Sequence, residues 1–248
     1  MSTDSIRPPP LRPHELAERI LYRDGLVLVL DKPAGIAVHP GPARGPHLEH
    51  WFPLLRFGFP NPPALAHRLD RDTSGCLVLG RHPKALRRLG RLFSEGKVEK
   101  TYWAVVIGIP KEPDGRIETG LVKTARGTGW RMLVDPAGQR AVTDYRVLAS
   151  GGGRSWLELK PRTGRTHQIR VHCATLGCPV VGDPVYGDPN ETRAMLLHAR
   201  AIALPLYPSR APIQVTAPVP PHMLAALTAL GYDAGRDDAP LAAEAIPA

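Results

Sequence analysis

Seven short apolar runs, spaced along most of the chain, limit the folds that this sequence can adopt. They are rich in β-branched or aromatic residues and end at Pro, Gly or polar residues, a pattern typical of buried strands. The two runs that flank Gly151-Gly152-Gly153 predict a hairpin. The predicted strands are residues 25–33, 76–81, 99–110, 141–150, 155–161, 197–207 and 211–218.

Three other segments have the period of a helix. One follows Pro83 and carries basic side chains opposite its apolar face, a second ends at Gly177, and a third follows the last strand. Because strands and helices alternate without a regular βαβ order, the sequence predicts an α+β fold with a largely antiparallel sheet. The apolar positions are Ala85, Leu89 and Leu92, then Ile169, Cys173 and Leu176, and finally Met223, Leu224, Leu227 and Leu230.

The 248 residues suffice for one large domain or two small ones, and no linker or repeat divides them. We expect a flexible, proline-rich arm at residues 1–13, a single domain at 14–232, and a disordered acidic Ala/Pro tail at 233–248. No run of about 18 apolar residues could cross a membrane, and the N-terminus lacks the apolar core of a secretory signal. The sequence therefore predicts a cytoplasmic protein, with a monomer as the default.

The charge balance indicates a class of partner. Lys and Arg outnumber Asp and Glu by 32 to 23, which gives a formal net charge of +9 at pH 7. A basic chain of this kind favours a polyanion, most commonly nucleic acid. Solubility alone would explain the same charge, so composition leaves both interpretations open.

Polar residues that could carry chemistry gather in two segments. In residues 64–81 a histidine and several charged residues, among them Arg68 and Asp70, precede a predicted buried strand, and the Thr73-Ser74-Gly75 turn would fix that loop. A solvated loop with local ion pairs is the alternative. In residues 159–172 three arginines surround the start of a predicted helix, where they could face a phosphate-rich partner or pair with a carboxylate. They are Arg162, Arg165 and Arg170.

Taken together and in this order, the motifs resemble the RluA-type pseudouridine synthases. The resemblance rests on HRLDRDTSG (67–75), KTYWAVV (100–106), TGRTHQIRVH (163–172) and GDPVYG (182–187). It extends to LVLDKPAGIAVHPG (28–41) and LLHARAIAL (196–204), and so covers nearly the whole predicted domain.

The resemblance implies a fold, a reaction and roles for single residues. The fold would be a mixed sheet flanked by helices around a central RNA cleft, and the enzyme would isomerise uridine without a metal or an organic cofactor. Asp70 takes the place of the family's nucleophile, and Arg68 that of the arginine that enters the RNA stack as the target base leaves. Tyr102, which in isolation reads as an ordinary strand aromatic, takes the place of the active-site tyrosine, and Arg165 that of the active-site arginine.

The residue types suit this chemistry. A carboxylate can attack carbon and leave again, which splits one difficult step into two easier ones. A neighbouring arginine favours the charged carboxylate and fixes its orientation. Tyr102 could stack on the detached uracil or remove its C5 proton, and Arg68 could fill the gap that a flipped base leaves. The residues do not distinguish attack at ribose C1′ from attack at uracil C6.

Many members of this family carry an additional N-terminal RNA-binding domain of the S4 type, for which the chain has no room before Leu28. We therefore expect the catalytic domain to select the RNA, mainly through the seven basic residues of segment 81–100, with a solvated helix face as the alternative. Transfer RNA is favoured slightly over large-subunit ribosomal RNA. The residues expected to face RNA are His67, Arg68, Arg71, Lys84, Arg87, Arg88, Arg91, Lys100, Arg162 and Arg170.

Two interpretations from other classes compete with this one. His167, His172, Cys173 and Cys178 are zinc-capable, but no C-x2-C pair is present and Cys173 lies on the apolar helix stripe, so we expect no metal. The other is a catalytically silent RNA-binding or ribosome-associated module on the same scaffold. Asp70, Tyr102 and Arg165 argue against it, since a decayed enzyme would be expected to lose at least one of them.

Overall fold

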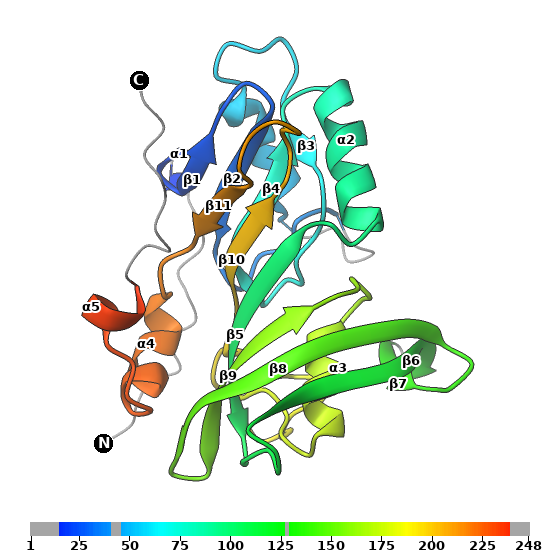
Figure 1. Ribbon diagram of the computed structural model, residues 1–248, viewed down its shortest axis with the longest axis vertical. Coiled ribbons are helices and arrows are strands. Elements are labelled where there is room, and N and C mark those ends of the chain that lie inside the picture. Colours follow the sequence, from blue (N-terminus) through cyan, green and yellow to red (C-terminus); the bar gives the residue numbers. More distant parts are fainter. Residues whose placement is uncertain (1–14, 41–45, 127–128, 239–248) are drawn as a thin grey trace.

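A single sheet of eleven strands organises the chain (Figure 1). The computed structural model describes residues 15–40, 46–126 and 129–238. The strands are β1 (Ile20–Arg23), β2 (Val27–Lys32), β3 (Ala64–Leu65), β4 (Ser74–Gly80), β5 (Glu99–Ile107), β6 (Asp114–Arg126), β7 (Gly129–Val134), β8 (Gln139–Gly151), β9 (Arg154–Pro161), β10 (Leu197–Leu204) and β11 (Ile213–Thr216). The helices are α1 (Glu15–Glu18), the 3-10 helix η1 (Leu48–Leu55), α2 (Pro83–Ser94), α3 (Gln168–Thr175), α4 (Pro221–Thr228) and α5 (Ala234–Asp237).

The strand order is β1-β2-β4-β10-β5-β9-β8-β6-β7, with β3 paired to β4 and β11 paired to β10. Within the described chain, β4 and β10 form the one parallel pair between named strands, and the other pairings are antiparallel. The prediction of an α+β fold with a mixed, largely antiparallel sheet is confirmed.

The parallel pair explains why the predicted turn contains a glycine. Gly75 has φ +104°, and a Cβ at this position would collide with the carbonyl of Ala199 on β10. The close approach of the two strands therefore requires glycine at position 75, immediately after the polar loop of residues 66–73.

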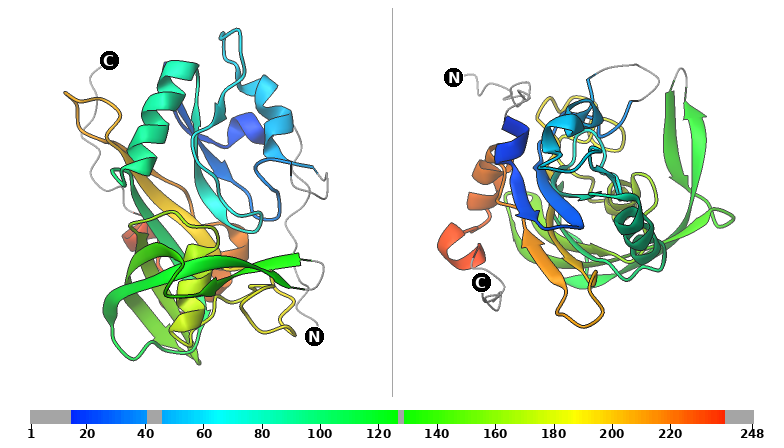
Figure 2. Two further views of the ribbon diagram at one scale, coloured as in Figure 1. Left: turned by 90° about the vertical axis from the view of Figure 1, so that its right-hand side faces the viewer. Right: turned by 90° about the horizontal axis from the view of Figure 1, so that it is seen from above.

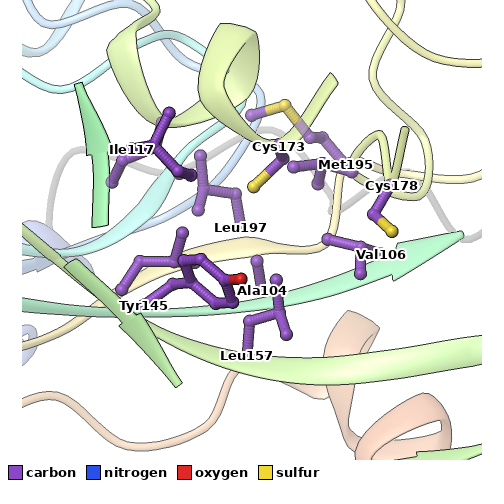
Figure 3. Packing of buried hydrophobic residues seen from close by; sticks show 12 residues of the cluster. Ala104, Val106, Ile117, Tyr145, Leu157, Cys173, Cys178, Met195 and Leu197 are labelled. Atoms are coloured by element: carbon purple, nitrogen blue, oxygen red, sulfur yellow. The ribbon is translucent and has the colours of Figure 1, made fainter. Parts of the chain in front are cut away.

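Helices α3 and α4 cover opposite faces of the lower half of the sheet, and α2 packs on β4 in the upper half (Figures 1 and 2). On β5, Ala104 and Val106 face the cluster that includes α3, whereas Trp103 and Val105 face α4. Cys173 of α3 points into the first of these clusters (Figure 3). The strict alternation along β5 is what a strand covered on both faces requires.

Several elements were not predicted from the sequence pattern, and the longest of them are β6, β7 and η1. Strands β6 and β7 form a long hairpin that projects from the body of the molecule (Figure 2). Most side chains of this hairpin are at least partly exposed, and its apolar residues are correspondingly sparse. The sequence therefore has no continuous apolar run that would predict these two strands. Helix η1, which contains Pro53, was not predicted from the sequence pattern.

The expected tail at 233–248 needs a correction. Residues Ala234–Asp237 form α5, capped by the Asp233 side chain, which accepts from Gly235 N. Asp238 accepts hydrogen bonds from the buried Arg200 and from the Tyr232 hydroxyl, so side-chain pairing orders a segment that composition alone suggested to be disordered. Residues 239–248 and the expected arm at 1–13 lie outside the described part of the chain. Within that part, no helix is both long and apolar enough to cross a membrane.

Candidate active site

Asp70 lies in the loop between β3 and β4, and a buried lysine holds this loop from below. The Lys32 side chain is fully buried, and its Nζ donates to the carbonyl oxygens of Pro33, Arg71 and Thr73 at 2.8–2.9 Å. Burial lowers the pKa of Lys32 to about 7, while three carbonyl acceptors match the three N–H groups of its ammonium form. Lys32 therefore ties the part of the loop that directly follows Asp70 to the end of β2. The sequence contained Lys32 but no signal of this role.

Arg170 joins Asp70 to a second, deeply buried carboxylate. Its Nη1 donates to Asp70 Oδ2 at 3.2 Å, and its Nε and Nη2 donate to the two oxygens of Asp183 at 2.7 and 2.8 Å. Burial opposes the charge of Arg170, but its hydrogen bonds and the charges of Asp183 and Asp70 outweigh this and raise its pKa. The guanidinium is thus charged and held in one orientation beside Asp70.

Arg170, and not Arg165 as the resemblance implies, is the arginine that the structure brings to Asp70. Arg165 is exposed, and its Nε donates to the carbonyl of Arg140 rather than to Asp70. Arg170, expected to face RNA, is buried and makes the contact with Asp70. The reason is helix phase. Arg165 precedes α3 and lies on the cavity rim, whereas Arg170 lies on the inward side of its first turn.

Asp70 opens onto two hollows. One is a cavity of about 590 Å³ that is also lined by Tyr102, Lys100, Phe93 and Arg165. The other, of about 290 Å³, lies between Asp70, His39 and Trp130. Because Asp70 lies where the two hollows meet, a molecule bound in either hollow can reach its carboxylate.

Tyr102 on β5 lines the larger cavity, as expected. Burial and then the nearby charge of Asp70 raise the pKa of Tyr102 well above its usual value, so the ring stays neutral. Its hydroxyl makes no hydrogen bond with the described residues. A neutral phenol with an unoccupied hydroxyl can stack on a base and donate to it, whereas its ionised form is disfavoured.

His67 and Lys100 line the same cavity, but their side chains also make hydrogen bonds within the protein. His67 Nε2 accepts from Val78 N at 3.0 Å, its ring stacks on Phe93, and burial lowers its pKa to about 3. His67 is therefore neutral and held by the fold, and its expected contact with RNA stays a prediction. Lys100 Nζ donates to the Thr163 carbonyl at 3.2 Å, and burial lowers its pKa to about 8.

Arg68 and Arg71 are exposed at the smaller hollow, as a role in RNA contact requires. Arg68 Nη1 lies 3.3 Å from His39 Nε2, and Arg71 pairs with Asp72 at 3.2 Å. Neither contact is buried, so either arginine can exchange it for a substrate contact.

Helix α2 presents its basic face beside the larger cavity. Arg87 and Arg91 share one side of the helix with Gly90 and Ser94, which line the cavity, and Lys84 and Arg88 lie on the same turns. Arg162 lies on another part of the rim and pairs with Asp144 at 2.7 Å. Basic side chains thus border the cavity from two elements.

Arg81 does not belong to this face, although it was counted among the seven basic residues of segment 81–100. It is buried, and its guanidinium donates to the carbonyls of Asp24, Arg56 and Phe57. It therefore serves the packing of three chain segments rather than an RNA contact.

The residues considered for a metal site are occupied otherwise. His172 is hydrogen-bonded to Thr143 and Thr119, and Cys173 is in the apolar cluster of Figure 3. Among the residues that the structure describes, no group of three or more His, Cys, Asp or Glu side chains is placed to hold an ion.

Comparison with known proteins gives consistent matches. Residues 26–175 match the protein family described as RNA pseudouridylate synthase. An uncharacterized RNA pseudouridine synthase of Zymomonas mobilis is 46% identical over 221 residues, which cover 88% of this chain and 99% of that protein. The ribosomal large subunit pseudouridine synthase D of Borreliella burgdorferi is 37% identical over 176 residues, or 65% of this chain and 52% of the relative.

Solved structures agree with the sequence matches. Human RNA pseudouridylate synthase domain containing 4 superposes with a TM-score of 0.74 at 28% identity, over 88% of this chain and 95% of the human one. Against the Borreliella relative and a Synechocystis one, the chain spans only about half of the relative's length.

Proposed function

Because the chain belongs to the RNA pseudouridylate synthase family, which isomerises uridine to pseudouridine in RNA, we propose that Asp70 is its nucleophile and Arg170 the group that orients it. The observation that carries this proposal is the contact of Asp70 with a buried, doubly anchored arginine at the mouth of a cavity. Such an arrangement orients a carboxylate and leaves it accessible to a bound molecule.

The reaction is an isomerisation without net oxidation. The N1–C1′ bond of uridine breaks, the uracil turns, and C5 bonds to C1′. The C5 hydrogen leaves as a proton and N1 gains one. Asp70 forms a transient bond to carbon and is released unchanged, which divides the exchange into two smaller barriers.

We assign Tyr102 a place beside the detached uracil. Its neutral ring offers a stacking surface, and its hydroxyl can donate to a uracil oxygen. The direction of its pKa argues against a phenolate that removes the C5 proton, which narrows the role expected from the sequence.

The target nucleotide must leave the RNA stack to reach Asp70, at a cost of a few kcal/mol. Arg68 is exposed next to Asp70 and held only by His39, so its planar guanidinium can replace the flipped base. The basic faces of α2 and of the rim at Arg162 and Arg165 can hold the phosphates on either side.

We propose structured ribosomal or transfer RNA as the substrate. The printed name of the Borreliella relative supports large-subunit ribosomal RNA, whereas transfer RNA is the expectation from the sequence. We place the reaction in the cytoplasm, where bacterial ribosomal and transfer RNA are found.

A silent RNA-binding module on this scaffold would not need Asp70, Arg170 and Tyr102 around one cavity. The test is tritium release from RNA labelled at uridine C5, with transfer RNA and ribosomal RNA from cells that lack the enzyme assayed separately. Release from one pool confirms the reaction and identifies the substrate class. RNA binding without release from either pool would favour the silent module.

A further inference from the structure

His167 has a backbone conformation that is uncommon for residues other than glycine. Its φ is +53° and ψ is +16°, and it shares a positive φ with only one other non-glycine residue of the described chain, Phe57. It is the N-cap residue of α3, yet its side chain does not cap the helix. Because the side chain of His167 does not cap the helix, the unusual backbone conformation points to a role for this side chain in other contacts.

The strained backbone places the imidazole between two functional groups. Its Nδ1 lies 3.0 Å from the Tyr186 hydroxyl, and its Nε2 lies 3.9 Å from Asp70 Oδ2. Trp130 stacks on the ring at 4.9 Å, and the side chain is only 13% exposed. Figure 1 shows that α3 lies beside the β6–β7 hairpin. Trp130 belongs to β7 of this hairpin.

The hydrogen bonds around Tyr186 determine which ring nitrogen carries the proton. Met132 N donates to the Tyr186 oxygen at 2.8 Å. The hydroxyl then has its own proton to donate, and His167 Nδ1 is the acceptor at hydrogen-bond distance. Burial lowers the pKa of His167, with Asp70 and Asp183 opposing this and Arg170 and Arg68 adding to it, so the ring is neutral at pH 7. Its single N–H is therefore on Nε2, on the side of Asp70.

We propose that His167 is a positioning residue for Asp70 and that Tyr186 sets the tautomer that this role requires. The Nε2–H of His167 and the Nη1–H of Arg170 address the same oxygen, Oδ2. Oδ1, which accepts no hydrogen bond from the described residues, is then the oxygen left for the substrate. The positioning role requires the 3.9 Å separation to shorten to hydrogen-bond distance in the complex with substrate. This inference rests on the proposed role of Asp70 as the nucleophile.

The test compares two replacements of His167 under single-turnover conditions. His167→Gln places an amide donor near the Nε2 position, whereas His167→Asn places it near Nδ1. Asn tolerates positive φ well, so the strain does not penalise this variant. We expect Gln to stay within about 3-fold of the wild-type rate and Asn to fall about 10- to 100-fold, the range for a hydrogen bond to a charged group. RNA affinity should change for neither.

The tautomer is read directly from the ¹⁵N chemical shifts of His167. We expect the Nε2–H form in the wild type and a mixture of tautomers in Tyr186→Phe, with a rate lower in proportion to the Nε2–H form that is lost, about 2-fold for an equal mixture. Tyr207→Phe, which also loses a tyrosine hydrogen bond but in a different cluster, should leave rate and tautomer unchanged. A wild-type rate for His167→Asn would overturn the positioning role of His167, and an unchanged tautomer in Tyr186→Phe would overturn the role of Tyr186.

The inference and the proposed function fail in different ways. If Asp70→Asn remains active, the nucleophile assignment is wrong and the role of His167 fails with it. If Asp70→Asn is inactive while His167→Asn matches the wild type, only the positioning role is wrong.

Discussion

Asp183→Asn should destabilise the fold strongly, because it removes the main counter-charge of Arg170. The side chains of Arg170 and Asp183 are 5% and 0% exposed, and two hydrogen bonds join them. Asp183 also accepts from the backbone N–H groups of Val185 and Tyr186. The substitution leaves a buried guanidinium with only the partly exposed Asp70 opposite.

The size of the effect follows from this burial. Removing one partner of a buried ion pair costs about 3–5 kcal/mol. Asn keeps one oxygen that can still accept hydrogen bonds, so we expect the lower end, about 3 kcal/mol. With a urea dependence of about 1–3 kcal/mol per molar, the midpoint of unfolding should fall by about 1–3 M.

Urea unfolding followed by circular dichroism measures this shift, and Asp144→Asn is the matched control. Asp144 also accepts from two arginines, Arg116 and Arg162, at 2.6 and 2.7 Å, but this cluster is on the surface. Exposed ion pairs contribute little, so its midpoint should move by less than a third as much. Equal shifts of the unfolding midpoint in the two variants would refute the argument that burial makes the Arg170–Asp183 pair important for stability.

Three further results follow from the structure. Arg87→Gln with Arg91→Gln should reduce the slope of log affinity against log salt by about 1.8 on duplex RNA, if each neutralises one phosphate; Arg81→Gln should lower stability and leave that slope intact. The pKa of His172 is lowered to about 4 by burial, so between pH 6.5 and 4 the unfolded chain binds a proton that the folded chain does not. The free energy of unfolding should therefore decrease as the pH is lowered from 6.5 to 4, by about 1.4 kcal/mol per pH unit more than in His172→Gln. Urea unfolding at each pH measures this difference. Treatment with EDTA should leave turnover unchanged; a loss that zinc restores would contradict the expected metal-free chemistry.

The sequence predicted those parts of the fold in which apolar residues follow the period of the element. Strand β5 and helix α2 are of this kind, since each buries a continuous stripe of side chains. The β6–β7 hairpin was missed because most of its side chains are at least partly exposed, so strand pairing within the hairpin and with β8 stabilises it more than burial does. A prediction from the periodicity of apolar residues has little signal for an element whose side chains are mostly exposed.

The site shows the same division between local and long-range information. Asp70 and Tyr102 could be identified because their motifs are local, and the structure places both at one cavity. The choice between Arg165 and Arg170 depends on where α3 begins and on which side faces the sheet, which spacing alone does not give. Asp183 contacts Arg170 only through the tertiary fold, so its role could not be read from its own segment.

The measurement that tests the central claim most directly is single-turnover conversion of one RNA by the wild type and by Asp70→Asn, with RNA affinity measured in parallel. The account predicts that Asp70→Asn forms no pseudouridine while it binds RNA nearly as well as the wild type, because the amide cannot replace the nucleophilic carboxylate. Pseudouridine formation by Asp70→Asn at a rate near that of the wild type would contradict it.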